Sequence, residues 1–522
     1  MLWPVLKPIV TPGSLFPYHH SLPMTSLLDG LILDLAGAVL AGLGVLILLA
    51  RLPPKLRRVT GSFLTGVFLW GLAFGAMTLL APGPKFPSLP KPSLLTGANL
   101  WWCRWCFRLA LGVPLLFAIL GWVAPALASR AARATRFTLA LVAFAGLWIV
   151  PELLYRDYLS HHAPVQSASL AEAQSGKEGR IVWILFDELS WKLALNEPPP
   201  GVELPNFARL SGQSISFANI QPVGNYTDLV IPSILARRRI QRIASNPEGK
   251  LIFFDESRAA WSSYEPRGTL FDVAREEGWS QGIVGWHIPY CRIFAGLLSR
   301  CYWRGSDALV IEPWASEQHS ALSNALALPQ ALASRLYSRS AAGAVVRNQE
   351  VDGFRELIEE SYAALRDERI HLLLIHLPAP HPPGIYDRRT HQICACGNYI
   401  DNLVLADDTL GALTAEISRG SLANRTTLIV SSDHSWRVPL WRTSPHWTAE
   451  EERISGGEFD PRPVFMIHFA GQTRGREVMA PLSELVEFDV MAGMLRGKIS
   501  GTQDVEDLVR SGSQDTASLK PN

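Results

Sequence analysis

The segment Arg180-Ile-Val-Trp-Ile-Leu-Phe-Asp-Glu-Leu-Ser190 decides the fold of this chain. Its six consecutive apolar residues are rich in β-branched and aromatic types, which is typical of a strand buried on both faces of a sheet. Two acidic residues, Asp187 and Glu188, follow directly. Because open α/β sheets carry their chemistry beyond the carboxyl ends of the strands, these carboxylates are predicted to lie in a functional site. A cap of the following turn is the structural alternative.

The composition divides the chain into an apolar first third and a mixed remainder. Hydrophobic residues occupy 48% of the 522 positions, and the excess lies before Arg180. This distribution favours a membrane segment followed by a globular domain. The formal net charge of +1 gives no field that would attract nucleic acid. We therefore expect a membrane partner and no nucleic-acid partner.

Four apolar runs in the first third each approach the length that crosses a bilayer, about 20 residues. Positive residues after the first run and between the third and fourth predict that both loops are cytoplasmic, which places the following domain outside. The sequence thus predicts a multi-pass protein of the inner (plasma) membrane with an extracytoplasmic globular domain. Buried helices of a soluble core are the alternative. The runs are 27–50, 62–81, 109–128 and 135–154.

Beyond residue 180, strand-like runs alternate with helical patterns. This alternation predicts an α/β domain with a mostly parallel central sheet covered by helices on both faces. The strand-like runs are 214–220, 282–285, 371–377, 427–431 and 464–469, and the helical ones are 354–365 and 399–417. The expected organisation is an N-terminal tail at 1–26, four transmembrane helices within 27–154, a linker at 155–179, the α/β domain at 180–500 and a C-terminal tail at 501–522.

A second functional segment is Gly224-Asn-Tyr-Thr-Asp-Leu-Val-Ile-Pro-Ser233. Thr227 stands at the expected start of a helix, where backbone N–H groups and the helix dipole favour an anion. A metal ion at this position could lower the pKa of the hydroxyl group and make it a nucleophile. An ordinary N-cap, with Asp228 in the first turn, accounts for the same residues.

Two further strand-like runs end in residues that can carry chemistry. Asp433 and His434 follow the run at 427–431. Adjacent Asp and His side chains can reach one metal ion from a bent backbone, with a structural ion pair as the alternative. His381 lies in a loop with four prolines, a stiff mount that suits a general acid or a group that binds an oxyanion. His376, earlier in that run, is interpreted as strand-end packing.

Four of the six cysteines lie in the predicted globular domain. If that domain is extracytoplasmic, a disulfide between Cys291 and Cys301 is expected. Unpaired thiols are the alternative.

Acidic residues, Thr, His and an Asp-His pair therefore mark four segments of the α/β domain, behind several apolar runs. This arrangement resembles the alkaline phosphatase superfamily, and within it the sulfatase-like branch that includes the phosphoethanolamine transferases and lipoteichoic acid synthases. The resemblance covers roughly residues 180–496. The segments that carry it are Phe186-Asp187-Glu188-Leu189, Thr227 with Pro232, Gly285-Trp286-His287, Pro380-His381-Pro382-Pro383 and Ser432-Asp433-His434.

The chain also departs from the pattern of that branch. No Cys or Ser stands in a Cys/Ser-x-Pro-x-Arg arrangement, so the formylglycine of true sulfatases is not expected. Ser435 follows Asp-His where the transferases have Gly. His446 is the one nearby candidate for the later His of the transferases, so the resemblance implies one metal ion rather than two.

The resemblance implies a membrane-anchored, metal-dependent transferase that moves a phosphorus-containing head group from a lipid to a cell-envelope acceptor. Asp187, Asp433 and His434 would hold one divalent ion, Zn or Mn, with Glu188 as a further ligand. Thr227 would contact the metal ion and attack phosphorus, giving a phospho-threonine intermediate.

Three more residues are expected to contact the substrate, and one to assist the chemistry. His381 would stabilise charge or protonate the leaving group, while His287, Arg437 and His446 would bind substrate. The first alternative function is a metal-dependent phosphodiesterase or sulfatase-like hydrolase, with water as the acceptor. The second is a catalytically silent membrane scaffold that retains the fold for binding.

Overall fold

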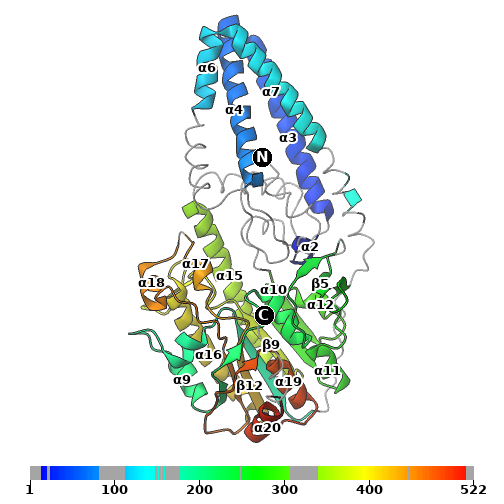
Figure 1. The fold of residues 1–522 in the computed structure, drawn as a ribbon, viewed down its shortest axis with the longest axis vertical. Helices are drawn as coiled ribbons and strands as arrows, with labels where there is room; N and C mark the ends of the chain where they lie inside the picture. Colours follow the sequence, from blue (N-terminus) through cyan, green and yellow to red (C-terminus); the bar gives the residue numbers. More distant parts are fainter. Residues whose placement is uncertain are drawn as a thin grey trace. The chain divides into compact units, whose positions relative to one another are not determined.

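The computed structural model describes residues 13, 15–19, 24–80, 112–146, 151, 154–155, 158, 177–246, 249–305, 339–444 and 446–512. The chain divides into two compact units. One comprises Met1–Val165, Ala244–Lys250 and Leu309–Arg339, and the other comprises Gln166–Ile243, Leu251–Ala308 and Ser340–Asn522. Long helices build the first unit, and the second has an α/β architecture (Figure 1).

The helices of the first unit follow the predicted apolar runs with one difference. α6 ends at Val123 and α7 begins at Pro125, so Arg130, Arg133 and Arg136 lie inside α7 rather than in the predicted loop. Proline fits the first turn of a helix but cannot continue the previous one, which accounts for the earlier break. The described helices of this unit are α2 (Phe16–His19), α3 (Met24–Arg51), α4 (Pro54–Leu80), α6 (Val113–Val123) and α7 (Pro125–Gly146).

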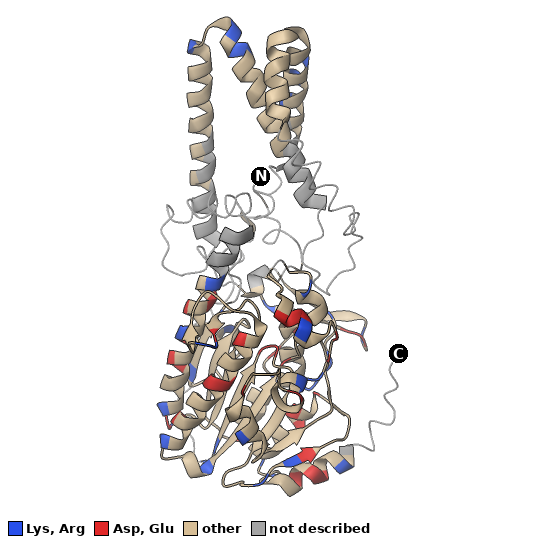
Figure 2. Ribbon diagram, turned by 90° about the vertical axis from the view of Figure 1, so that its left-hand side faces the viewer, with Lys and Arg blue, Asp and Glu red and all other residues tan. Residues whose placement is uncertain are grey.

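Apolar side chains on these helices are exposed. Val39, Leu40 and Trp122 expose 62%, 69% and 76% of their surface. Figure 2 shows the described turns of these helices mostly free of charge, with Lys and Arg near the connection of α3 and α4. Within the part of the chain that the structure describes, no helix combines the length and apolarity required to cross a membrane. The predicted linker and the cysteines at 103 and 106 lie almost entirely outside the described residues.

An eight-stranded sheet forms the centre of the second unit, in the order β14-β2-β13-β12-β1-β9-β7-β8. The neighbours β12, β1, β9, β7 and β8 are parallel, whereas β13 is antiparallel to both β12 and β2. The predicted mostly parallel sheet is therefore confirmed. Its strands are β1 (Arg180–Phe186), β2 (Ile215–Phe217), β7 (Gln281–Trp286), β8 (Arg300–Arg304), β9 (Leu372–Leu377), β12 (Thr426–Ser432), β13 (Phe465–His468) and β14 (Arg476–Val478).

β1 is buried along its whole length, as its apolar sequence predicts. Its register pairs Phe186 with Ser432 of β12 on one side and with Leu377 of β9 on the other. The residues that follow these three parallel strands therefore emerge at one edge of the sheet. Asp187, Asp433 and the proline-rich loop are brought together in this way.

Helices cover both faces of the sheet, each over its own apolar core. Val182, Ile184 and Phe186 pack on one face, and Trp183 and Leu185 pack on the other. This alternation follows from the two-residue period of a strand. The first face is covered by α9 (Pro205–Ser211), α15 (Arg339–Arg366) and α16 (Tyr399–Arg419), and the second by α10 (Thr227–Leu235), α11 (Leu270–Glu276), α19 (Val486–Leu495) and α20 (Thr502–Gly512).

Shorter elements complete the second unit. α20 lies in the segment predicted as a tail, yet its Val505 and Val509 are buried in the second core. The remaining elements are η1 (Lys192–Asn196), β3 (Ile220–Gln221), β5 (Leu251–Asp255), β6 (Ala260–Ser263), α12 (Tyr290–Ile293), β10 (Tyr386–Asp387), β11 (Gln392–Ile393), η2 (Ala423–Arg425), α17 (Val438–Trp441), α18 (Ala449–Ser455) and β15 (Leu482–Ser483). β4 (Ile243–Ser245) lies where the chain passes from the second unit into the first.

The predicted disulfide between Cys291 and Cys301 is present. It joins α12 to β8, with the two Cα atoms 5.7 Å apart. Cys394 and Cys396 form a second disulfide between β11 and α16. Disulfides of this kind are typical of proteins that fold in an oxidising compartment.

Candidate active site

Three buried side chains from two neighbouring strand ends face one another at the edge of the sheet. Asp187 follows β1, and Asp433 and His434 follow β12. His434 Nε2 lies 3.2 Å from Asp433 Oδ2 and 3.7 Å from Asp187 Oδ1. One ligand atom from each residue lies within 4.8 Å of the other two. The sequence predicted this grouping, and we call it the Asp-Asp-His group.

The donor atoms of the Asp-Asp-His group fit a divalent metal ion. Asp187 Oδ1, Asp433 Oδ2 and His434 Nε2 are buried and have no hydrogen-bond partner among the described residues. Burial raises the pKa of Asp433 to about 6 and, together with the charge of Asp433, raises the pKa of Asp187 well above its usual range. Burial also lowers the pKa of His434, which keeps its imidazole neutral. Two carboxylates and a neutral imidazole are a ligand set typical of Zn²⁺ or Mn²⁺.

Thr227 brings a hydroxyl group to the same place. It is the first residue of α10, and its side chain is buried. Its Oγ1 donates a hydrogen bond to Asp187 Oδ2 across 3.3 Å. The N-cap of α10 is Tyr226 in an extended conformation, so Thr227 is not the N-cap. Its hydroxyl group is thus directed to the Asp-Asp-His group rather than to the helix end.

The Glu188 carboxylate does not join the Asp-Asp-His group. It forms an ion pair with Arg437 Nε and accepts hydrogen bonds from Trp441 Nε1 at 2.7 and 3.0 Å. Its backbone has a φ of 63°, in the left-handed region, which turns the chain sharply after Asp187. The backbone N–H of Glu188 donates to Asp433 Oδ1 at 3.2 Å. The structure therefore connects Glu188 to the group through its amide.

Arg437 stands beside the segment that carries the hydroxyl group. Its guanidinium lies 5.6 Å from the centre of the Tyr226 ring and 5.9 Å from that of Trp441. Nη1 donates to the backbone oxygen of Asn225 at 3.4 Å. The predicted substrate-binding cation is thus within the site and is paired with Glu188.

His381 lies between two indole rings. Its ring centre is 5.3 Å from that of Trp286 and 5.2 Å from that of Trp441. Asn402 of α16 holds the loop, donating to the backbone oxygens of His381 and Pro383 at 3.0 Å each. Burial, and next the charge of Arg437, lower the pKa of His381 well below its usual range. The imidazole is therefore neutral at physiological pH.

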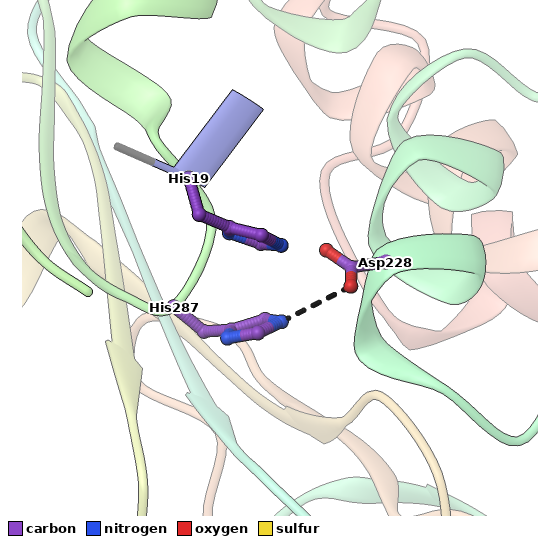
Figure 3. Close-up of side chains that lie close together, drawn as sticks. All are labelled: His19, Asp228 and His287. Atoms are coloured by element: carbon purple, nitrogen blue, oxygen red, sulfur yellow. Dashed lines mark ion pairs between the residues drawn. The ribbon is translucent and has the colours of Figure 1, made fainter. Parts of the chain in front are cut away.

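His287 is paired with Asp228, the residue after Thr227. Figure 3 shows the imidazole and the carboxylate facing each other, with Nε2 and Oδ2 3.3 Å apart. His287 has a φ of 64° directly after β7, which turns its side chain out of the strand. The pair places two further ionisable groups at the start of α10, where Asp228 follows Thr227 in the sequence.

Other parts of the site differ from the sequence predictions. His446 is exposed and lies outside the Asp-Asp-His group. His376 is buried, and its Nδ1 is 2.9 Å from the Tyr290 hydroxyl group, in agreement with a packing role. Trp441 and Asn402 were not predicted, because no spacing or residue pattern links them to the strand ends. Trp286 was named in the Gly285-Trp286-His287 segment but was given no role in the site.

Comparisons with known proteins give structural matches only. No protein-family model and no curated protein sequence matches the chain. Similar solved structures include the PsFucS1 sulfatase from Pseudoalteromonas sp. (17% identity, 63% of this chain and 69% of that chain, TM-score 0.35). Another is a protein in the alkaline phosphatase superfamily from Vibrio parahaemolyticus (15% identity, 62% and 67%, TM-score 0.35). A third is murine ectonucleotide pyrophosphatase/phosphodiesterase 5 (11% identity, 61% and 95%, TM-score 0.34).

In this chain, the carboxyl edge of a mostly parallel sheet carries three convergent metal-type donors and a hydroxyl group in contact with one of them.

Proposed function

We propose that the second unit is a metal-dependent phosphoryl-transfer enzyme with Thr227 as its nucleophile. One observation carries this proposal. Three buried donor atoms without hydrogen-bond partners in the described structure, from Asp187, Asp433 and His434, converge beside a threonine hydroxyl group. Buried polar atoms that make no hydrogen bond destabilise the folded state. The convergence of three such atoms therefore favours a bound cation.

The residues divide the reaction between them. A divalent ion held by Asp187, Asp433 and His434 would supply positive charge that lowers the pKa of a hydroxyl group and stabilises charge on phosphorus oxygens. Asp187 Oδ2 accepts the proton of Thr227 as Oγ1 attacks phosphorus. The Oγ1–P bond forms, the bond from phosphorus to the leaving oxygen breaks, and its electron pair stays on that oxygen.

Proton delivery to the leaving oxygen is assigned to His287, held by Asp228. His381 was the predicted proton donor, but its lowered pKa leaves it neutral and without a proton to spare at neutral pH. It keeps the second predicted role, as a neutral hydrogen-bond donor to developing charge.

The resulting phospho-threonine needs an acceptor. Our leading proposal is transfer of a phosphorus-containing head group from a lipid donor to a hydroxyl group of a cell-envelope acceptor. Hydrolysis by water is the second candidate, and it uses the same residues. Free head group released from the lipid donor in the absence of any acceptor would favour hydrolysis over transfer.

We also propose that the first unit attaches the enzyme to the inner (plasma) membrane. Large exposed apolar side chains are numerous on α3, α4, α6 and α7, whereas those of the described second unit are Trp261, Leu440 and Met479. Extended apolar surfaces are rare on proteins that contact only water, and lipid chains would cover this one. The Cys291–Cys301 disulfide supports an extracytoplasmic second unit. Recovery of the full chain in the soluble fraction after cell breakage would contradict attachment.

The experiment that tests the catalytic proposal compares the native chain with Asp433→Ala. Elemental mass spectrometry should find one transition-metal ion per native chain and none in the variant. Peptide mass spectrometry after a brief reaction with a phosphodiester should find the phosphoryl adduct on Thr227. A metal-free native chain without an adduct would leave the scaffold alternative in place.

A further inference from the structure

Six positive side chains gather at one end of the first unit and take no part in the proposed reaction. One of them ends α3, and three stand in the first two turns of α4. Figure 2 shows Lys and Arg near the connection of these two helices. The first three turns of α7 carry the other two. All six are exposed, and we call them the basic end: Arg51, Lys55, Arg57, Arg58, Arg130 and Arg133.

The packing of α6 against α4 brings the two parts of the basic end together. A Cβ atom at Gly121 of α6 would meet Ser62 Oγ at 2.5 Å and the backbone oxygen of Arg58 at 3.2 Å. α6 therefore touches α4 beside its first turns, only two residues before α6 ends. α7 begins at Pro125. Its two arginines of the basic end lie within about 12 Å of that residue along the axis, at 1.5 Å per residue.

Acidic residues of these helices do not compensate the charge. α4, α6 and α7 contain no Asp or Glu. Asp34 is the acidic residue of α3 nearest to Arg51 in the sequence, and about 25 Å of helix separates the two positions. Arg57 donates from Nη2 to the backbone oxygens of Ala50 and Leu52, at 3.1 and 3.2 Å, which holds the end of α3. The basic end thus carries positive charge that the helices bearing it do not neutralise.

Large apolar side chains are exposed beside these charges. Leu56, between Lys55 and Arg57 in the sequence, is 50% exposed. Trp122 and Leu127 stand on either side of the break between α6 and α7, and they are 76% and 55% exposed. Cations next to exposed apolar and indole groups are typical of helix ends at a bilayer surface. A nucleic acid would match the charges but not the apolar side chains.

We propose that the basic end binds the headgroups of anionic phospholipids, so that the first unit prefers a membrane rich in such lipids to a neutral one. The inference rests on the proposed membrane attachment of the first unit, and it names the lipid that this unit selects. Each Lys or Arg close to an anionic membrane surface is attracted by about 1 kcal/mol, which is a factor of about five in an association constant.

The first test measures which lipid the full chain selects after reconstitution into vesicles of phosphatidylcholine and phosphatidylglycerol. Spin-labelled copies of each lipid report, by electron paramagnetic resonance, the fraction in contact with the protein. Both leaflets have the same composition, so the orientation of the protein does not affect the result. The native chain should select phosphatidylglycerol by at least about twofold, because a preference of roughly fivefold at the basic end is averaged over all lipids around the unit. Equal selection of the two lipids would overturn the proposal and leave an acidic protein as the occupant.

Charge variants separate the basic end from the overall charge of the chain. Five of its residues are changed to Gln, and Arg57 is kept because its hydrogen bonds hold the end of α3. The lipid preference of this variant should fall close to one. A matched variant loses five exposed arginines of the second unit and should keep the native preference. The two sets are Arg51, Lys55, Arg58, Arg130 and Arg133 for the basic end, and Arg258, Arg369, Arg389, Arg419 and Arg453 for the control.

Equal losses of preference in these two variants would reject a role for the basic end. A third variant changes the four arginines of the first set to Lys, which keeps every charge, and it should retain most of the native preference. Loss of the preference in the lysine variant would overturn the role of charge. Circular dichroism of the reconstituted chains establishes that each variant is folded.

Salt tests the same charges without a substitution. At an ionic strength of about 1 M the Debye length falls to about 3 Å, so the preference of the native chain should approach one while the amount of lipid in contact stays the same. A preference that persists at high salt would overturn its electrostatic origin. Absence of any lipid contact at low and high salt would reject the membrane attachment itself. Lipid contact without preference at low salt would reject the binding of anionic headgroups alone, and neither result depends on turnover.

Discussion

Two acidic clusters are buried in the second unit, and they differ in the groups that face them. In the Asp-Asp-His group, two carboxylates meet an imidazole and a hydroxyl group. The other cluster is Glu484, which follows β15, and Glu487 in α19, both 0% exposed. One oxygen of Glu484 accepts a hydrogen bond from the Val223 N–H at 2.9 Å, and its other oxygen has no partner in the described structure.

The groups that face each cluster determine whether we expect it to bind a metal ion or to hold protons. Burial raises the pKa of Glu484 and of Glu487 well above the usual range, and the charge of Glu487 raises that of Glu484 further. Without a neutral nitrogen ligand, this pair is expected to stay protonated, whereas the Asp-Asp-His group is expected to bind a cation. Both clusters are buried and acidic. They differ in the imidazole of His434, which the Asp-Asp-His group has and the glutamate pair lacks.

The largest expected contrast comes from removing one carboxylate charge in each cluster. Asp433→Asn should lower metal affinity and activity by more than the ~10–100-fold that disturbing an outer partner of a metal ligand costs. Glu487→Gln replaces a protonated carboxyl group by a neutral amide and should leave metal content unchanged. Elemental mass spectrometry and steady-state kinetics measure both. Loss of metal in Glu487→Gln would show that the two clusters act as one site.

Metal removal should lower the stability of the protein only where the Asp-Asp-His group is intact. A metal ion present at about 100 times its Kd stabilises the folded state by about 2.7 kcal/mol, so chelation should lower the Tm of the native protein. The double variant Glu484→Gln, Glu487→Gln should lose the same amount on chelation, while Asp433→Asn should lose little. Differential scanning fluorimetry gives the three values. A chelation effect that disappears in the double variant would move the metal ion to the glutamates.

The pH dependence of stability should report the glutamate pair. Their raised pKa values mean that the folded state holds protons that the unfolded state releases above the ordinary glutamate pKa of about 4.3. Their contribution to the free energy of unfolding is therefore complete below that pH. It is lost as the pH rises toward the pKa of the folded state, by up to about 1.4 kcal/mol per pH unit for each proton.

Urea unfolding of the metal-loaded protein between pH 5 and pH 9 (about two units each side of neutral) measures this slope. The double glutamine variant should show a flatter profile than the native protein, because its amides do not titrate. Identical slopes in the two proteins would mean that the glutamates are ionised in the folded state.

The smallest expected effect isolates the hydrogen bond from Val223 to Glu484. Glu484→Gln retains an acceptor oxygen for the Val223 N–H, whereas Glu484→Met has a similar length and no such acceptor. The methionine variant should be less stable than the glutamine variant by about 1 kcal/mol, the cost of one buried unsatisfied donor. Chemical unfolding of both variants at the same pH, about 7, compares their free energies of unfolding. Equal stabilities would show that another acceptor takes the Val223 N–H.

Much of the α/β core could be predicted because its signals are local. The run before Asp187 is apolar at every position, which only a doubly covered strand explains, and strands of this kind bring Asp187 and Asp433 to one edge. The Cys291–Cys301 disulfide was expected for a different reason, the predicted extracytoplasmic location of the domain. The end of α6 was misplaced because the apolar run continues beyond Pro125, and its hydropathy hides the break.

The partners of Glu188 and Glu484 could not be predicted, because their contacts join segments far apart in the chain. Glu188 looked like a ligand from its position next to Asp187, but its left-handed backbone directs the carboxylate to Arg437. Glu484 contacts a residue 261 positions away. Neither contact leaves a pattern in one sequence, since only the folded backbone brings these groups within reach.

Asn402 has a consequence for how tightly a substrate can be held. Its amide donates to the backbone oxygens of His381 and Pro383, and its oxygen accepts from the Ile385 N–H at 2.8 Å. The loop that carries His381 thus loses its conformational entropy when the protein folds rather than when a substrate arrives. More of the contact energy gained at this wall of the site is then retained as affinity. Aspartate in place of Asn402 would present an acceptor to two carbonyl groups and return that entropy to the loop.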